Sequence, residues 1–141
     1  MIDCALISSD ETFRHAVMGI VRNPKNQATL ALDLKVYADG VNRDGVRKVM
    51  GASPKVIFLD LGSDPSGVSG IQTFSQEAPD VALIVAGPSL SAEGLLAVMR
   101  AGASEYLPRP VSSQEVAEAF ERVRRKTRVD GKAEQGKLGR V

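Results

Sequence analysis

Three charged residues that could form a reactive site follow predicted strands of this chain. Asp60 ends the apolar run at residues 56–59, and Asp10 comes soon after a strand-like segment at residues 2–8. Arg109 follows a later and shorter segment of the same kind. An unbroken apolar run is typical of a strand buried on both faces, and in open α/β sheets ligands bind at the carboxyl ends of such strands. We therefore expect Asp10, Asp60 and Arg109 to share one edge of a sheet.

Asp10 and Asp60 are expected to lie close together, and two neighbouring carboxylates favour a cation between them. Two like charges raise each other's pKa unless a cation intervenes. Mg²⁺ suits this position, because it binds one or two carboxylates, a backbone carbonyl and several waters. Two structural alternatives stay open: Asp10 and Glu11 can simply favour the N-terminus of a first helix, and Asp60 with Arg109 can form a plain ion pair.

The spacing of apolar residues predicts five strands that alternate with five helices. The strands are expected at residues 2–8, 30–38, 56–60, 81–86 and 104–107. The helices are expected at residues 10–21, 42–50, 71–77 and 90–100, with a fifth that starts near Ser112. Because parallel strands need long crossover connections, usually helices, this alternation predicts an α/β fold. We expect a doubly wound, five-stranded parallel sheet of order 2-1-3-4-5 with helices on both faces.

Apolar spacing within two of the helices predicts which side chains face the sheet. The fourth helix is expected to be amphipathic through Leu95, Leu96 and Met99. The last helix begins with Ser112 and, three residues later, Glu115, which is the pattern of a capping box. Its expected buried residues are Val116, Ala119, Phe120 and Val123.

The composition suits one soluble domain with an aliphatic core: of 141 residues, 43% are hydrophobic and 25% are charged. Trp is absent and only two Tyr and four Phe occur, so we expect no aromatic platform for stacking nucleic-acid bases. The single cysteine, Cys4, excludes an internal disulfide and is expected to be a small buried hydrophobe. Because no apolar stretch is long enough to span a bilayer and no signal peptide is evident, the cytoplasm is the expected compartment.

Charge is divided unevenly along the chain. Residues through Glu121 include 10 basic and 15 acidic side chains, whereas those from Arg122 onward include 8 basic and 2 acidic ones. Basic residues near the end of a helix complement its dipole without a further partner, so nucleic-acid or membrane-surface binding is the less favoured interpretation. Residues 127–141 have almost no apolar content, which predicts a basic flexible linker or tail after a domain at residues 1–126.

Several short motifs in the expected order resemble one protein family. They are the acidic residues after the first strand, the segment Phe58-Leu59-Asp60-Leu61, residues 101–106 and the pair Arg109-Pro110. Through this order and spacing, residues 2–126 resemble the receiver domain of bacterial response regulators, which has the CheY-like fold. The resemblance implies that a histidine kinase phosphorylates Asp60, and that Asp10, Asp60 and the backbone of Gly62 hold Mg²⁺.

The chain departs from the receiver pattern at several positions of this site. Receivers usually have two acidic residues where this chain has Ser9 and Asp10, so one carboxylate of the metal site is missing. They have Ser or Thr where this chain has Gly87, and Lys where it has Arg109. A hydrogen bond to a charged group contributes about 1.5–3 kcal/mol. The absence of a hydroxyl at position 87 would therefore remove a large part of the free energy that drives a phosphorylation switch.

Three further residues are assigned to this edge of the sheet. Tyr106 matches the aromatic residue of the receiver switch, although a half-buried ring with its hydroxyl in water is the simpler alternative. Ser89 is a candidate replacement for the missing hydroxyl. The bond between Arg109 and Pro110 lies in a turn from a strand to a helix, where we expect a cis proline.

A narrower resemblance covers the C-terminal half, from residues 102–111 through the last helix to a linker that contains Gly and Lys. These features resemble the N-terminal receiver-like domain of pilus-assembly proteins of the CpaE/TadZ type, in which an ATPase domain follows. No phosphate-binding loop occurs in this chain, so the resemblance implies that an ATPase domain would lie beyond Val141.

The leading functional hypothesis is therefore a non-enzymatic, receiver-like interaction and localisation module in Tad/Flp-type pilus assembly. The alternative is a working phosphoacceptor of a two-component system. Expected partners are a histidine kinase or pilus and secretion components, and a second copy of the chain. The expected dimer face is formed by the fourth helix, the last strand and the fifth helix, with apolar contributions from Leu90, Val98 and Ala117.

Overall fold

The computed structural model describes residues 1–63 and 68–140, and for residues 127–140 the backbone alone. It contains a five-stranded sheet of order β2-β1-β3-β4-β5, in which all neighbouring strands are parallel. The strands are β1 (Ile2–Ile7), β2 (Ala28–Leu34), β3 (Val56–Asp60), β4 (Ala82–Gly87) and β5 (Glu105–Pro108). The helices are α1 (Glu11–Arg22), α2 (Arg43–Gly51), α3 (Val68–Glu77), α4 (Ala92–Ala101) and α5 (Ser113–Arg140), with short 3-10 helices at Pro24–Asn26 and Ala38–Gly40. The predicted fold class and strand order are confirmed.

The second strand differs most from its prediction. It runs over Ala28–Leu34 instead of residues 30–38, and its first residue pairs with Ile2 of β1. After Leu34 the chain leaves the sheet, and Ala38 begins a 3-10 helix. Apolar residues in the connection after Leu34 therefore extended the predicted strand beyond the segment that pairs.

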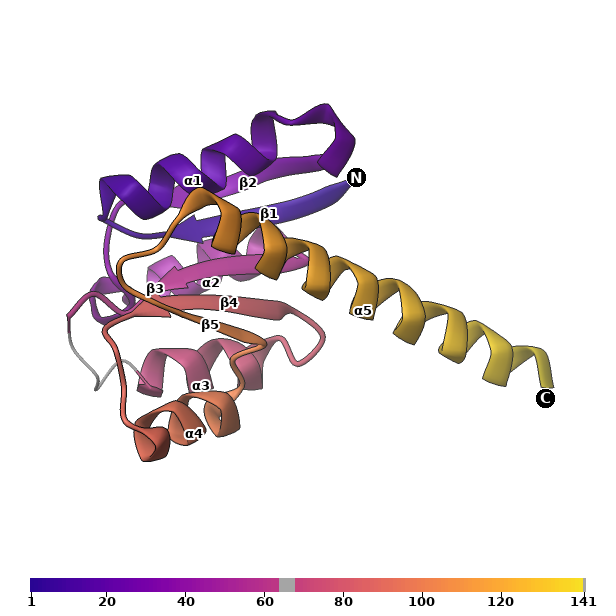
Figure 1. The fold of residues 1–141 in the computed structure, drawn as a ribbon. Coiled ribbons are helices and arrows are strands. Elements are labelled where there is room, and N and C mark those ends of the chain that lie inside the picture. The colour runs from indigo at the N-terminus through magenta and orange to yellow at the C-terminus, as the bar shows by residue number, and fades with distance from the viewer. Residues whose placement is uncertain (64–67, 141) are drawn as a thin grey trace.

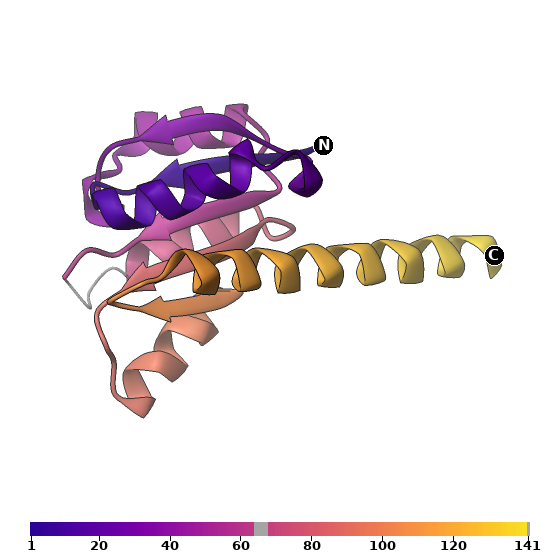
Figure 2. The same ribbon diagram turned by 45° about the horizontal axis from the view of Figure 1, so that its top comes forward.

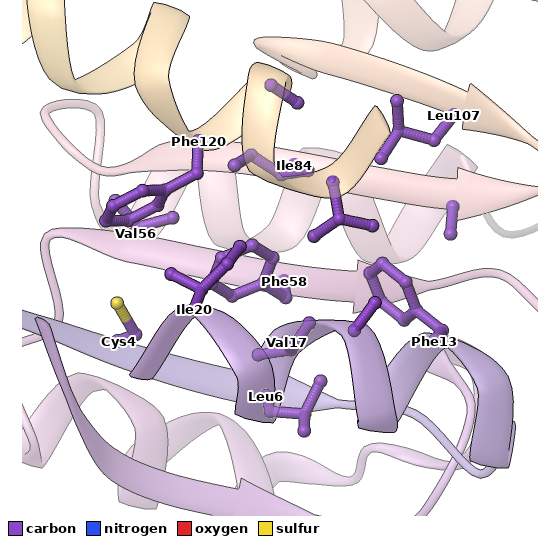
Figure 3. Packing of buried hydrophobic residues seen from close by; sticks show 14 of the residues in the cluster. Cys4, Leu6, Phe13, Val17, Ile20, Val56, Phe58, Ile84, Leu107 and Phe120 are labelled. Atoms are coloured by element: carbon purple, nitrogen blue, oxygen red, sulfur yellow. The ribbon is translucent and has the colours of Figure 1, made fainter. Parts of the chain in front are cut away.

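Helices α1 and α5 cover one face of the sheet (Figure 1). Phe58 of β3 lies at the centre of this core, with the ring of Phe13 6.4 Å away in an edge-on arrangement and that of Phe120 stacked at 6.1 Å (Figure 3). The four residues predicted to be buried in α5 are all in this core. Cys4 is buried here too, as expected, and burial raises the pKa of its thiol to about 12.

Helices α2, α3 and α4 cover the other face, and here the prediction for α4 is wrong. Leu95, Leu96 and Met99 were expected to face the sheet, but 42%, 48% and 40% of their surfaces are exposed. The buried residues of α4 are Val98 and Ala101. Val98, which was expected on a dimer face, is only 1% exposed.

Helix α4 packs closely against α3 at its C-terminal end. Gly102, which ends α4 with φ of 127°, lies so close to Ser75 of α3 that a Cβ atom at position 102 would overlap the Ser75 side chain. Apolar residues occur on two sides of α4, and the side with Val98 and Ala101 is the one packed into the core. We call the exposed stripe Ala92, Leu95, Leu96 and Met99 the α4 outer face.

Helix α5 begins with the predicted capping box: the Glu115 N–H donates to Ser112 Oγ at 3.1 Å, and the Ser112 N–H donates to Glu115 Oε1 at 3.3 Å. The helix continues to Arg140 and projects beyond the sheet, where the sequence predicted a linker (Figure 2). Lys, Arg, Glu and Gln are good helix formers, so a segment poor in apolar residues can still be helical. The domain boundary at residue 126 stays a prediction. Over the residues that the structure describes, no helix is long and apolar enough to cross a membrane.

Candidate functional site

Asp60 is the last residue of β3, and its side chain is fully buried. Side chains alternate along a strand, so Asp60 points to the same face as Val56 and Phe58, toward the core under α1 and α5. Ile7 of β1 pairs with Leu59, which places the next residue of each strand, Ser8 and Asp60, side by side. The predicted edge position of Asp60 is therefore correct, but the carboxylate is covered.

Both oxygens of the Asp60 carboxylate accept hydrogen bonds from the chain itself. Ser8 Oγ donates to Oδ2 at 2.7 Å, and the backbone N–H of Gly62 donates to Oδ1 at 2.8 Å. The guanidinium of Arg109 also donates to Oδ1 and forms an ion pair with it. Gly62 has φ of 70°, a conformation that suits glycine and turns its N–H back toward Asp60.

Arg109 connects Asp60 to Asp10. It follows β5, where its backbone N–H donates to the Gly87 carbonyl at 2.9 Å, and its long side chain passes the end of β4. Nη1 then donates to Asp10 Oδ2 at 2.8 Å, while Nη2 contacts Asp60 and also donates to the carbonyl of Gly62 at 3.2 Å. The peptide bond between Arg109 and Pro110 is cis, as predicted.

We call the group Ser8, Asp10, Asp60, Gly62 and Arg109 the carboxylate network. Ser8 closes it into a ring, because its Oγ also accepts a hydrogen bond from the backbone N–H of Asp10 at 3.0 Å. Asp10 caps α1 as well, since its Oδ1 accepts from Thr12 N at 3.3 Å. Both structural alternatives open at the sequence level, the helix cap and the ion pair, are thus present. Buried charges are tolerated where they are paired and hydrogen-bonded, as they are here.

Ser8, not Ser9, is the serine of this site. Ser9 is exposed, and its hydroxyl donates to the carbonyl of Lys35 at 3.3 Å, outside the network. Sequence reasoning missed Ser8 because the register between β1 and β3 decides which residue lies beside Asp60. Arg14 was missed too: this buried side chain donates to the Ser8 carbonyl at 2.8 Å and pairs with Asp33 at 2.5 Å, which fixes the turn after β1.

The three predicted magnesium ligands come together, but the residues present do not fit the ion. Asp10, Asp60 and the Gly62 carbonyl each accept a hydrogen bond from Arg109. Mg²⁺ needs its oxygen ligands at about 2.0–2.1 Å in a near-octahedral shell, and the guanidinium takes up the space between these oxygens. Within residues 1–63 and 68–126, no group of three His, Cys, Asp or Glu side chains is arranged to bind a metal.

Gly87 and Tyr106 form a close pair beside the network. A Cβ atom at position 87 would lie 2.5 Å from the Tyr106 hydroxyl, so only glycine leaves room for this position of the ring. The Tyr106 hydroxyl donates to the carbonyl of Pro88 at 2.5 Å. The simpler alternative, a ring whose hydroxyl is in water, therefore does not describe this side chain. Ser89 is exposed and is not among the partners of Asp60.

The environment of Tyr106 changes the acidity of its hydroxyl. Burial raises the pKa of Tyr106 to about 12, with the positive charge of Arg109 lowering it and the negative charge of Asp60 raising it by smaller amounts. The phenol is therefore neutral at physiological pH and remains a donor to the Pro88 carbonyl.

Several arginines at the basic end have partners within the chain. Arg122 pairs with Glu105 at 2.7 Å, Arg125 pairs with Glu121 at 3.6 Å, and Arg124 donates to the carbonyl of Asn26 at 3.1 Å. The hydrogen bond from Arg122 to Glu105 raises the pKa of that guanidinium. These contacts give the described arginines structural roles and add no support for nucleic-acid binding.

No family model matches the chain, and no curated protein matches it. Solved structures do. A protein described as the CpaE2 pilus assembly protein of Sinorhizobium meliloti 1021 has a TM-score of 0.69 and 21% identity, over 86% of this chain and 99% of that one. The CpaE pilus assembly protein of Burkholderia thailandensis E264 has a TM-score of 0.67 and 20% identity, over 87% and 98%.

Response-regulator domains superpose equally well. The response regulator domain of Thermotoga maritima CheB has a TM-score of 0.68 and 18% identity, over 91% of this chain and 97% of that one. At such identities the similarity concerns the fold alone. The chain has the receiver, CheY-like fold.

Proposed function

We propose that this chain is a non-enzymatic, receiver-like module for protein interaction and localisation in Tad/Flp-type pilus assembly, and that it works without phosphorylation of Asp60. Its partners are pilus or secretion components and a second copy of the chain, and it acts in the cytoplasm. The receiver fold, typically a regulatory and non-catalytic module, supports this proposal.

The observation that carries the proposal is the state of Asp60. A phosphoacceptor must present an oxygen to a phosphodonor, but the Asp60 side chain has no exposed surface. Its two oxygens hold hydrogen bonds from Ser8, Gly62 and Arg109. Breaking such charge-assisted bonds before each transfer would be costly. Position 87 also lacks the hydroxyl that would bind a phosphoryl group.

The assignment to pilus assembly rests on two supports. Solved structures of similar fold include CpaE-type pilus assembly proteins from Sinorhizobium and Burkholderia. Separately, the motif at residues 102–111 and the basic segment that follows resemble the same proteins in sequence. In this proposal α5 leads toward an ATPase domain beyond Val141.

The test is a phosphomimetic titration followed by amide NMR. We expect beryllofluoride or acetyl phosphate with Mg²⁺ to leave the resonances of Asp60, Gly62 and Arg109 unchanged, because the carboxylate is already bonded. The matched control is Asp60→Asn under the same conditions. A spectral change in the wild-type protein that disappears in Asp60→Asn would refute the proposal.

A second candidate function, a working phosphoacceptor, is favoured by one observation: Asp60, Asp10 and a basic residue before a cis proline still converge at the carboxyl edge of the sheet. In this alternative Arg109 would move away from Asp60 when a phosphodonor binds. Transfer of radiolabelled phosphate to Asp60, absent in Asp60→Asn, would establish it. The proposal above expects no label.

The α4 outer face gives the module a surface for a second copy. Glu93 and Arg100 are exposed and lie two helical turns apart beside Leu96. If α4 packs antiparallel against α4 of another copy, each Glu93 comes opposite the other Arg100, and the apolar stripes meet. A twofold contact requires such self-complementarity. This arrangement uses Leu96 where the sequence had suggested Val98.

Light scattering over a concentration series tests the dimer. We expect a concentration-dependent dimer in the wild-type chain, and a monomer after Leu96→Glu, which places a charge in the centre of the contact. Glu118→Lys on α5 is a matched control for a single charged change away from this face. A monomeric wild-type chain at all concentrations would contradict the dimer.

A further inference from the structure

We infer that the guanidinium of Arg109 is a built-in cation that replaces the divalent metal ion at the carboxylate network, so that the three oxygens predicted to bind Mg²⁺ are already occupied. The inference goes beyond the proposed function, because it would hold whichever partner the module binds. The sequence placed Arg109 at the edge of the sheet but did not indicate that it competes with a metal ion for the same oxygens.

The first support is the identity of the atoms that Arg109 contacts. The carboxylates of Asp10 and Asp60 and the carbonyl of Gly62 are the three oxygen ligands predicted for Mg²⁺. One guanidinium contacts all three, with Nη1 on Asp10 and Nη2 on both Asp60 and Gly62. A planar guanidinium suits this task, since it presents several N–H donors in a fixed geometry.

The second support is the charge balance. Asp10 and Asp60 both form ion pairs with the same guanidinium, which places one positive charge between two negative ones. Asp60 has no exposed surface and Arg109 is 28% exposed, so water screens this group only weakly. Among the described residues, Arg109 is the cationic side chain that contacts both carboxylates.

The third support is that all four carboxylate oxygens have donors. Asp60 Oδ2 accepts from Ser8 and Asp10 Oδ1 accepts from the Thr12 N–H, while the remaining two oxygens bind Arg109. Mg²⁺ gives up its waters reluctantly. To enter, it would have to displace a cation that is tied to the chain and loses no translational freedom on binding.

The inference predicts that removal of the guanidinium uncovers a metal site. Mn²⁺ is the probe, because it prefers the same carboxylate, carbonyl and water ligands as Mg²⁺ and its free form is counted directly by electron paramagnetic resonance. We expect weak or undetectable Mn²⁺ binding by the wild-type chain. We expect binding at least about tenfold tighter by Arg109→Met, which keeps side-chain length but removes the charge, because the ion then no longer has to displace a cation from the three oxygens.

Two variants serve as controls. Arg122→Met removes the same charge from an exposed site that pairs with Glu105, and should bind Mn²⁺ as the wild type does. The double variant Arg109→Met with Asp10→Asn removes one of the uncovered ligands and should lose the gained affinity. Together they separate a specific site from a general effect of net charge.

Two outcomes overturn the inference: Mn²⁺ binding by the wild type as tight as that by Arg109→Met, or a folded Arg109→Met that binds no tighter than Arg122→Met. If Arg109→Met is too unstable to titrate, thermal melting decides, because a bound ion raises the midpoint of unfolding. Mn²⁺ should then raise the midpoint for Arg109→Met and not for the wild type, and no rise in the variant overturns the inference. A wild-type chain that is inert to Mn²⁺ but responds to beryllofluoride in a way that Asp60→Asn abolishes would overturn the proposed function and leave this inference standing.

Discussion

The carboxylate network and the α4 outer face lie on the same domain but differ in how their chemistry is satisfied. In the network, each carboxylate oxygen of Asp60 and Asp10 has a donor from the chain itself. On the α4 outer face, Leu95, Leu96 and Met99 leave 40–48% of their surfaces in water. The polar group at the edge of the sheet is thus closed by internal contacts, whereas the apolar surface is open.

The two regions differ in whether they leave side chains exposed for contact with a partner. Exposed large apolar side chains that gather in one place mark an interaction surface more often than single ones do. A buried and fully paired ion network, by contrast, mainly holds its own geometry. The network therefore fixes the edge of the sheet, whereas the α4 outer face keeps its apolar side chains exposed.

The largest expected effect comes from opening the network. Asp60→Ala leaves Arg109, Ser8 and the Gly62 N–H without their acceptor, and removal of one partner of a buried ion pair costs about 3–5 kcal/mol. Since Arg109 is 28% exposed and can turn toward water, we expect a loss near the lower bound, about 3 kcal/mol. Urea unfolding measures it. A loss below about 1 kcal/mol would mean that the network is not closed as described.

The next effect separates the two sides of α4. Val98→Ala removes buried methyl groups and should cost about 2 kcal/mol of unfolding free energy. Leu96→Ala on the outer face should change it by less than about 0.5 kcal/mol while it weakens self-association. Denaturation curves of the Val98→Ala and Leu96→Ala variants measure both changes in unfolding free energy. Equal losses would show that α4 packs with its outer face covered in the monomer.

A smaller effect is expected for the hydroxyl of Tyr106, which lies between the two regions. Tyr106→Phe removes the hydrogen bond to the Pro88 carbonyl and should cost about 1 kcal/mol, the usual contribution of a neutral hydrogen bond. Amide NMR should show the change confined to the β4–α4 connection. Changes that spread to Asp60 and Gly62 would instead connect the network to α4.

The smallest expected effect is a change in the titration of tyrosine. Burial raises the pKa of Tyr106 to about 12, so the native state holds this proton more tightly than the unfolded chain, whose Tyr ionises near 10.0. The stability from this group is therefore complete below about pH 10 and declines as the pH rises toward 12. Phenolate absorbance measures the ionisation.

The same titration examines Gly87. In Gly87→Ser the new Cβ atom would meet the Tyr106 hydroxyl and turn the flexible end of that side chain outward. The pKa of Tyr106 should then fall toward 10.0, its ordinary value. Gly51→Ser is a control, because a Cβ atom at position 51 has open space around it. An unchanged titration in Gly87→Ser would contradict the close packing of this pair.

Much of the fold follows from local sequence. Apolar runs such as residues 56–59, alternating with amphipathic segments, predicted a parallel α/β sheet and placed Asp60 at its carboxyl edge. The capping box was predicted because it depends on Ser112 and Glu115 alone, and the cis bond before Pro110 was predicted from its place in a turn between a strand and a helix. The end of the second strand was misplaced, since apolar residues continue past the last pairing position at Leu34.

Short-range periodicity was enough to predict the alternation of strands and helices, the burial of Phe58 and the place of Asp60 at the end of its strand. Only the tertiary structure decided that Ser8 lies beside Asp60, since the register of β1 on β3 joins residues far apart in the chain. It also decided which side of α4 is exposed: with apolar residues on two sides, periodicity allows two orientations, and the observed packing buries Val98 and Ala101. Finally, it showed that Arg109 reaches all three predicted metal ligands, because a long side chain can cross the end of a strand in a way that no spacing records.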